Sequence, residues 1–285
     1  MSLARHGTGP GDVVGALASQ IHPVFMLPPL AASAFGAVLA GRVDGALAAG
    51  HLFVVFCALY TAHVKDGYVD FHTRGEDDDH PLTARGCWVA LAGATVGFGL
   101  GAFALGVVVG PVAAALCLPG WVVGYLHAPQ LDTNPVTATL GYPVGIGFAL
   151  LGGHYVQLRA FSVTVLAFAA VFVVVLAGIK VVDDATDYAY DRSIDKRTVA
   201  VVIGRRRARR VAYGLMAAGL AGVIALVLVG VFPPASVGAV AVFGVVAAIA
   251  RRAGEDDHLA TMLLIRASYL FLATLVIAVW FRPLS

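Results

Sequence analysis

Long apolar runs separated by short polar segments dominate the chain. Nine such runs lie at about residues 22–41, 46–65, 87–106, 108–126, 137–157, 161–181, 211–232, 234–250 and 262–281. Each approaches the roughly 20 residues that a helix, rising about 1.5 Å per residue, needs to cross a bilayer. Alternation with period two is absent, which argues against a barrel, and backbone groups in lipid must be satisfied within their own segment. The pattern predicts an all-α polytopic membrane protein, a single domain over residues 1–285 with nine transmembrane helices.

Composition supports this prediction and excludes other classes of protein. Of the 285 residues 59% are hydrophobic and 13% charged, whereas a soluble domain carries about 25% charged residues. The formal net charge of +2 gives no basis for a nucleic-acid partner. Cys57, Cys87 and Cys117 lie 30 residues apart in or beside apolar runs, a spacing that fits neither a metal site nor a disulfide framework. We interpret them as small apolar packing residues.

Charged residues collect on one side of the predicted bundle. If the N-terminus marks side one, that side holds 16 of the 19 Lys and Arg residues, and Arg42, Arg159 and Arg282 are on the other. The positive-inside bias then predicts a multi-pass cell-membrane protein with a cytoplasmic N-terminus and an external C-terminus. All of the 17 acidic residues except Asp44 are also on the cytoplasmic side. That rule does not require acids to segregate, so their position needs another explanation.

Two acidic clusters follow the second and sixth apolar runs. If the helices continue, Asp66 and Asp70 share one face, and Asp184, Asp187 and Asp191 share another. Stacked carboxylates repel one another unless a cation compensates them. Mg²⁺ prefers oxygen ligands and commonly combines one or two carboxylates with phosphate oxygens. The clusters therefore predict two metal sites of this kind.

The spacing of the clusters suggests an internal repeat. Asp66 to Asp183 and Asp70 to Asp187 are both 117 residues apart, and each cluster ends the second helix of a predicted four-helix set. Such a repeat would place the two clusters across one central cavity. The run 76–79 holds four consecutive acids, and for it we favour a solvated loop.

The second cluster resembles a known motif. Asp184-x-x-Asp187-x-x-x-Asp191-Arg192, continued by residues 195–204, is similar to the D-x-x-D-x-x-x-D-R motif and following G-K-R-T-L-x-V-x-x-G stretch of the UbiA superfamily of intramembrane prenyltransferases. The nine helices and the acidic segments after helices two and six also resemble the plan of that family. Residues 68–77, 124–131, 140–148 and 153–157 resemble the menaquinone-type branch, which prenylates 1,4-dihydroxy-2-naphthoate.

Three positions depart from the family pattern. The usual first motif begins Asn-Asp with a second acid three residues later, whereas Asp66 stands four residues before Asp70. Either Asp66 replaces the Asn or one residue has been inserted. His22-Pro23 stands where the family has Arg-Pro, and the basic residue expected soon after Pro129 is missing.

The resemblance implies Mg²⁺-dependent transfer of a polyprenyl group from its diphosphate to a lipophilic, aromatic acceptor that serves as a quinone precursor. Asp66 and Asp70 would hold one Mg²⁺, and Asp184, Asp187 and Asp191 another. Neighbouring basic residues would stabilise the departing diphosphate, namely Arg74, Lys180, Arg192, Lys196 and Arg197. Aromatic residues would line the cavity that shields the allylic cation, namely Tyr68, Tyr125, Tyr142, Tyr155 and Tyr188.

Four histidines could orient or deprotonate an acceptor, namely His63, His72, His127 and His154. Of these we place His127 among the substrate-binding residues. No two of the four form a metal-ligand pair with another His or Cys at helical spacing, so a structural, hydrogen-bonded role is the simpler interpretation of each.

Rival functions remain open at this point. A terpene cyclase of the same superfamily would ionise the diphosphate without an acceptor, and an isoprenoid or carotenoid prenyltransferase would use an alkene. A CDP-alcohol phosphotransferase shares Asp66-Gly67 but lacks the following Ala-Arg of that signature. An ion-coupled transporter usually carries its charges near the bilayer midplane, whereas these acids lie at helix ends.

Overall fold

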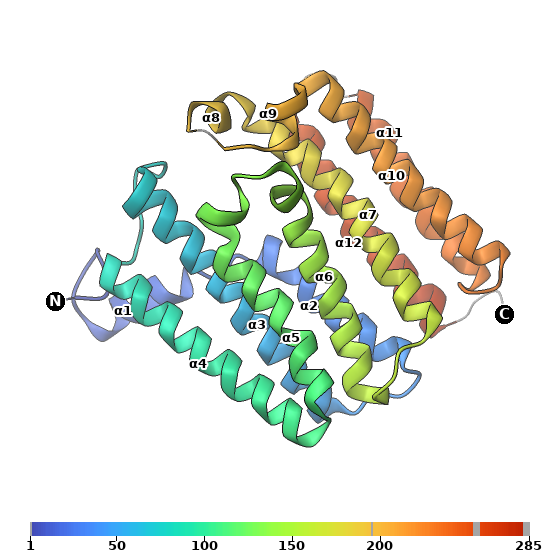
Figure 1. Cartoon of the computed structure of the whole chain (residues 1–285), viewed down its shortest axis with the longest axis horizontal. Helices are drawn as coiled ribbons and strands as arrows, with labels where there is room; N and C mark the ends of the chain where they lie inside the picture. Colours follow the sequence, from blue (N-terminus) through green and yellow to red (C-terminus); the bar gives the residue numbers. More distant parts are fainter. Residues whose placement is uncertain (1, 195, 253–256, 282–285) are drawn as a thin grey trace.

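The computed structural model describes residues 2–194, 196–252 and 257–281. Every regular element there is a helix, with one isolated bridge between Ala4 and Leu82. Figure 1 shows the long helices side by side in a bundle. The long helices are α2 (Pro23–Leu39), α3 (Gly45–Gly67), α4 (Ala84–Val108), α5 (Pro111–Leu126), α6 (Pro135–Leu158), α7 (Val163–Thr186), α10 (Arg205–Leu228), α11 (Val237–Arg252) and α12 (Asp257–Trp280). Three helices are short, namely α1 (Pro10–Ala18), α8 (Tyr188–Ser193) and α9 (Val199–Ile203). The predicted all-α polytopic fold is confirmed.

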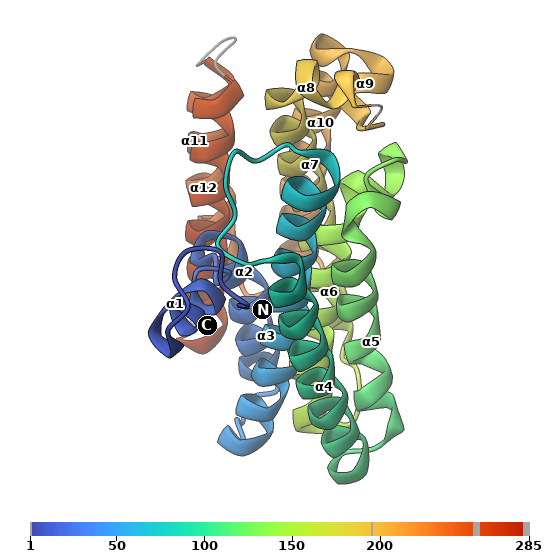
Figure 2. The same cartoon turned by 90° about the vertical axis from the view of Figure 1, so that its left-hand side faces the viewer.

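The predicted spans correspond to these helices, with one difference at the start of the chain. Eight helices in the described residues are long and apolar enough to cross a membrane, and a ninth span exists only if α1 and α2, bent by 64° to one another, are taken together. Helix α2 has 17 residues, so by itself it is about 25 Å long. The apolar pattern did not indicate α1, which is short and lies beside the N-terminus in Figure 2.

Two groups of helices make up the bundle. Helices α2 to α6 pack on one another, α7, α10, α11 and α12 form the second group, and the α6–α7 contact joins the two. Figure 1 shows the first group at left and the second at right. The largest buried apolar cluster lies mainly in the second group and includes Phe168, Phe243 and Phe271. The cavity described below lies among helices of both groups.

Helices α2 and α6 approach each other closely because glycines stand where they meet. A β-carbon at Gly36 would collide with the carbonyl oxygen of Leu150, and one at Gly153 with that of Ser33. Small residues at such contacts let backbones come together where lipid offers no hydrophobic driving force between helices. This contact holds α2, the first helix to line the cavity, against the rest of its group.

The helices that carry the acidic clusters end irregularly. Helix α3 continues into the π-helix η1 (Tyr68–Arg74), and α5 into the π-helix η2 (His127–Leu131). Helix α7 ends at Thr186, and Asp187 stands at the junction with the short helix α8. Helices α8 and α9 lie together beyond the end of α7 (Figure 1). π-Helical turns are rare in proteins, and those that occur are often found at functional sites.

Candidate active site

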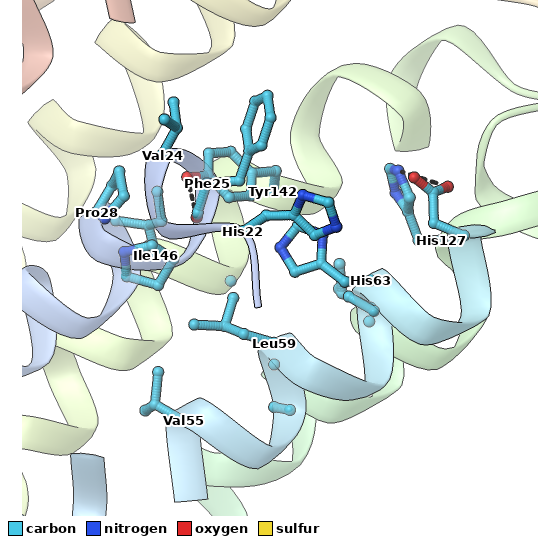
Figure 3. Close-up of a pocket in the computed structure, with 18 of the residues that line it drawn as sticks. His22, Val24, Phe25, Pro28, Val55, Leu59, His63, His127, Tyr142 and Ile146 are labelled. Carbon is cyan, nitrogen blue, oxygen red and sulfur yellow. Dashed lines mark hydrogen bonds and ion pairs between the residues drawn. The ribbon is translucent and has the colours of Figure 1, made fainter. Parts of the chain in front are cut away.

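A cavity of about 640 Å³ opens among α2, α3, α5, α6 and α7. This size is within the range of small-molecule sites, which are mostly apolar with a few polar groups. Its polar lining includes Asp66, Asp70, Lys180 and Asp183, and its apolar lining includes Val54, Leu59, Ile146 and Leu176. Figure 3 shows Val55, Leu59 and Ile146 at a distance from His127. From Val54 to Asp66 along α3 the helical rise is about 18 Å, so the cavity is elongated and carries its charge at one end.

The first acidic cluster lies in this lining. Asp66 and Asp70 both line the cavity, on either side of the junction between α3 and η1. A π-helix is wider than an α-helix and commonly absorbs a single extra residue. The four-residue spacing of Asp66 and Asp70 coincides with this turn, which favours the insertion alternative for the first motif.

The second cluster does not lie on one continuous helix face, as we had predicted from its spacing. The helix breaks at Asp187, whose side chain is exposed. Asp184 on α7 and Asp191 on α8 are buried, with relative exposures of 5% and 4%. The chain turns at the break, so the (i, i+3, i+7) rule for an unbroken helix does not apply. None of the three is among the cavity-lining residues.

Lys180 connects the second cluster to the cavity. Its Nζ lies 2.8 Å from Asp183 Oδ2 and 2.7 Å from Asp184 Oδ1. Lys180 and Asp183 line the cavity, while Asp184 lies behind them. The ammonium group is thus held at the polar end of the cavity by two carboxylates. Asp183 was absent from the residues that we predicted as metal ligands.

A chain of ion pairs joins the two clusters. Arg74 of η1 lies 2.7 Å from Asp132 and 3.6 Å from Glu76, and Lys196 lies 3.6 Å from Glu76 and 3.9 Å from Asp191. Glu76 is therefore half-buried between two cations, which corrects the interpretation of residues 76–79 as a solvated loop at this one position. Its neighbours at 77 and 79 are exposed yet line the cavity.

Burial has left carboxylate oxygens of both clusters without hydrogen bonds. Asp70 Oδ1 and Asp184 Oδ2 are buried and have no hydrogen-bond partner among the described residues. Burial, with the nearby charges of Asp184 and Asp187 adding to it, raises the pKa of Asp191 to about 6, against the opposing effect of Lys196. Buried polar atoms are normally paired, and unpaired hard oxygens match the preference of Mg²⁺. The donor set thus fits this ion.

The remaining basic residues predicted for the site lie farther out. Arg192 and Arg197 are exposed. The backbone N–H of Arg197 donates to the carbonyl of Asp132 at 3.2 Å, so this segment is held against the end of η2. Of the five, Arg74, Lys180 and Lys196 make ion pairs with the two acidic clusters in the part of the chain that the structure describes.

The predicted aromatic residues divide between two places. Tyr142 and His127 line the cavity, and the Tyr142 hydroxyl donates to the carbonyl of Phe25 at 3.0 Å. The other predicted tyrosines are outside the cavity lining as the structure describes it, namely Tyr68 against Trp88, Tyr125 stacked on Trp121, Tyr155 beside Phe161 and Tyr188 against the large apolar cluster.

Three histidines from different helices meet at the polar end of the cavity. The ring centroids of His22 and His63 are 4.8 Å apart with the rings tilted by 38°, and Figure 3 shows them next to each other, with His127 beyond. His127 Nε2 lies 3.9 Å from Asp66 Oδ1. His22 had been noted only as a departure from the Arg-Pro pattern. The available signal was its position directly before α2, whose first residues are apolar.

Comparison with known proteins adds the fold to this geometry. No family model matches the sequence, and no curated protein matches it. Among solved structures, a UbiA homologue from Archaeoglobus fulgidus bound to GPP and Mg²⁺ aligns at 16% identity with a TM-score of 0.71, over 95% of this chain and 99% of that one. The chain has the UbiA fold. A UbiA homologue from Aeropyrum pernix K1 gives 16% identity and a TM-score of 0.70, over 90% of this chain and 97% of that one. A digeranylgeranylglyceryl phosphate synthase aligns at 12% identity with a TM-score of 0.73, over 95% of this chain and 98% of that one.

The UbiA fold of this chain sets its two acidic helices around one cavity. Asp66 on α3 and Asp183 on α7, which are 117 residues apart, both line it. The repeated spacing of 117 residues therefore indicated Asp183. The motif match did not, because it begins one residue later, at Asp184.

Proposed function

We propose that this protein transfers a prenyl group from its diphosphate to a lipophilic acceptor within the membrane, in an Mg²⁺-dependent reaction. The observation that carries the proposal is the elongated cavity, apolar along its length and lined at one end by Asp66, Asp70, Lys180 and Asp183. A prenyl diphosphate has the same division between an apolar chain and a charged head. The UbiA homologue of Archaeoglobus fulgidus, whose fold this chain shares, binds GPP or DMAPP with Mg²⁺.

The carboxylates of the two clusters would hold the metal. We assign Asp66 and Asp70 to one ion and Asp184, Asp187 and Asp191 to another, with Asp183 as an additional ligand at the cavity. The buried oxygens of Asp70 and Asp184 that have no hydrogen-bond partner among the described residues support this assignment. When bound, Mg²⁺ supplies Lewis-acid neutralisation of the diphosphate charge.

The protein's own groups would do three further things. Lys180, Arg74 and Lys196 would donate charge-assisted hydrogen bonds to the diphosphate oxygens as negative charge develops on them. The apolar walls would exclude water from the allylic carbon. Tyr142, fixed by its bond to Phe25, would present its ring to that carbon. Arg192, Arg197 and the tyrosines outside the cavity lining would not contact the prenyl diphosphate directly in this arrangement.

For the acceptor we propose an aromatic quinone precursor with a ring hydroxyl. The support is the resemblance of residues 124–131 and 140–148 to the menaquinone-type branch, together with the neighbouring rings of His22 and His63 in the cavity lining. Either imidazole could take the proton that the ring loses. The acidic ends would face the cytoplasm, in agreement with the positive-inside bias.

One incubation tests the proposal. The purified full-length chain, with Mg²⁺, GPP or longer prenyl diphosphates and a panel of hydroxylated aromatic acids, should release diphosphate and give a prenylated ring product. Replacing Asp184 and Asp187 together by Ala should lower the rate at least about 100-fold, as loss of groups that hold or orient a metal does. Asp78→Ala, an exposed acid outside the cavity lining, should leave it unchanged.

The outcomes separate the rival functions. Hydrocarbon released from the prenyl diphosphate alone would replace the transferase with a cyclase. Retained activity in the Asp184→Ala, Asp187→Ala double variant would reject the metal-site assignment.

A further inference from the structure

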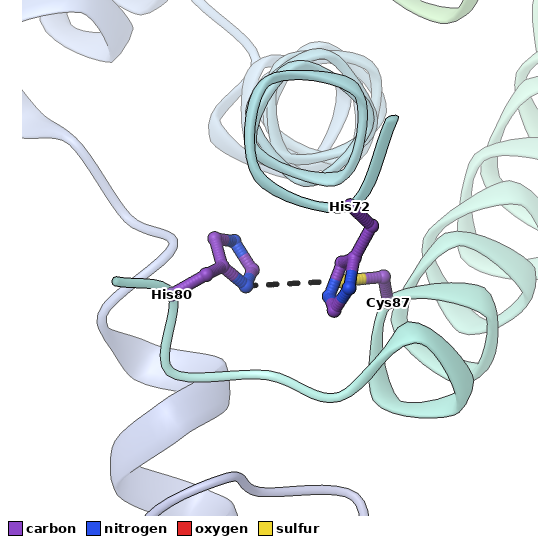
Figure 4. A group of neighbouring side chains, drawn as sticks. All are labelled: His72, His80 and Cys87. Atoms are coloured by element: carbon purple, nitrogen blue, oxygen red, sulfur yellow. Dashed lines mark hydrogen bonds between the residues drawn. The ribbon is translucent and has the colours of Figure 1, made fainter. Parts of the chain in front are cut away.

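Two histidines and a cysteine meet beside the cavity, and the proposed reaction does not use them. Of the three, His80 is also a cavity-lining residue. His72 is in η1, His80 in the segment before α4, and Cys87 in the first turns of α4. One potential ligand atom from each lies within 4.8 Å of the other two. Figure 4 shows the His72 and His80 rings and the Cys87 sulfur facing a common point. His80 and Cys87 are buried, at 4% and 0% exposure, and His72 is half-buried.

The backbone of Leu82 supplies most hydrogen bonds of this cluster, and its N–H donates to His80 Nδ1 at 3.2 Å. His72 Nε2 and His80 Nδ1 both lie 3.1 Å from the same carbonyl oxygen, that of Leu82. Cys87 Sγ is 4.0 Å from His80 Nδ1, the outer limit of a hydrogen bond to sulfur. His80 Nε2 is buried without a hydrogen-bond partner among the described residues. The thiol is thus only weakly bonded and the two imidazoles share one carbonyl acceptor, so a cation at this point would take the place of their shared protons.

The surrounding backbone fixes the cluster in place. The N-terminal segment lies along residues 80–83, where the backbone N–H of Arg5 donates to the carbonyl of Pro81 and that of Thr83 to the carbonyl of Leu3, each at 2.9 Å. Arg5 also donates to the carbonyl of His80 at 3.1 Å. Thr83 caps α4 through its bond to the N–H of Gly86 at 3.0 Å. His80 and the start of α4 are thus positioned independently of any bound ion.

We propose that His72, His80 and Cys87 bind a zinc ion. Imidazole and thiolate are ligands of choice for Zn²⁺ and poor ligands for Mg²⁺. Tetrahedral bonds of about 2.0–2.3 Å put ligand atoms roughly 3.3–3.6 Å apart, so the cluster closes by about 1 Å through small side-chain rotations. The fourth position is left to the Leu82 carbonyl oxygen or a water. The thiol gives up its proton on binding.

The ion would join η1 to the segment before α4. η1 carries Asp70, and Asp77 and Asp79 of that segment line the cavity. Zinc would therefore hold three carboxylates of the cavity in fixed relation without touching the substrate. This role is separate from prenyl transfer, and the metal measurement stands whether or not that reaction is found.

The test measures metal on the full-length chain in detergent, purified without a polyhistidine tag. We expect about one zinc per chain by mass spectrometry, retained in excess Mg²⁺. After exchange to Co²⁺, a thiolate-to-cobalt charge-transfer band should appear, which carboxylate-bound cobalt does not give. A strong zinc chelator should lower the melting temperature.

Variants assign the ligands. Cys87→Ser should lose the charge-transfer band, and His72→Gln or His80→Gln should weaken zinc retention at least about 10-fold. Cys117→Ser, a buried cysteine that donates to the carbonyl of Ala113 instead, should keep both. Wild-type protein without zinc and without the cobalt band would overturn the proposal even if a variant fails to fold. Persistence of the band in Cys87→Ser would overturn it equally.

Discussion

Asp191 shows how position changes the chemistry of a single carboxylate. It is 4% exposed, and burial raises its pKa from 3.8 to about 6, with Asp184 and Asp187 adding to the effect and Lys196 opposing it. A raised pKa means that the folded chain binds the proton more tightly than the unfolded chain does. Without metal, Asp191 therefore lowers the free energy of unfolding as pH rises from about 4 to about 6. Above about pH 6 this destabilisation is complete and stays constant.

We expect the stabilisation by Mg²⁺ to have the opposite pH dependence. The ion binds the ionised carboxylate, so the rise in melting temperature on adding Mg²⁺ should be largest near pH 7.5 and should decrease as pH falls through 6. Asp191→Asn should remove part of this dependence and Asp78→Asn none of it. If Mg²⁺ raised the melting temperature by the same amount at pH 7.5 and at pH 5, the assignment of Asp191 to the metal site would be contradicted.

At the scale of elements, two features of the helices decide where the site lies. The π-turn after α3 keeps Asp66 and Asp70 in one cavity lining, and the break after α7 exposes Asp187 while Asp184 and Asp191 stay buried. The close contact of α2 with α6 then brings His22, just before α2, to the same cavity. Helix ends and helix contacts, more than the helices themselves, therefore build the site.

The contact between α2 and α6 gives a prediction of stability. Gly36→Ala places a methyl group against the carbonyl of Leu150, and overpacking of this kind costs about 1–3 kcal/mol. Its melting temperature in detergent should fall by several degrees. Gly93→Ala is the matched control, because nothing lies within 4 Å of its β-carbon and alanine favours the helix. Equal melting temperatures for the two variants would show that the helices can move apart at no cost.

For the whole molecule, the gathering of 32 of the 36 charged residues on one predicted side goes with the shape of the cavity. Its charged end lies where α3 and α7 end, and its apolar lining continues along the bundle. An amphiphilic substrate would then be able to keep its head at the membrane surface and its chain among the helices.

This arrangement predicts the sidedness of the protein. Arg42→Cys, at an exposed position between α2 and α3, should react with a membrane-impermeant maleimide in intact cells. Ser193→Cys, exposed at the end of α8, should react only in inverted vesicles. The wild-type chain is the control, because Cys57, Cys87 and Cys117 are buried. The reverse labelling pattern would place the acidic ends outside.

The sequence by itself determined the helical class, most spans to within a few residues, and the two acidic clusters. Span length and helical periodicity are local properties, so a run such as 161–181 can be recognised without knowing what it packs against. The cluster at Asp184 was visible for the same reason, since its motif is contiguous.

The tertiary structure alone decided which of these residues meet. The break that exposes Asp187, the ion pairs that bury Glu76, and the convergence of His72, His80 and Cys87 all depend on where helix ends and connecting segments lie. Cys87 looked like a packing residue because its partners lie outside its own helix, in η1 and in the segment before α4. Contacts between separate elements leave no periodic signal in the chain, since side chains far apart in sequence come together only when the bundle closes.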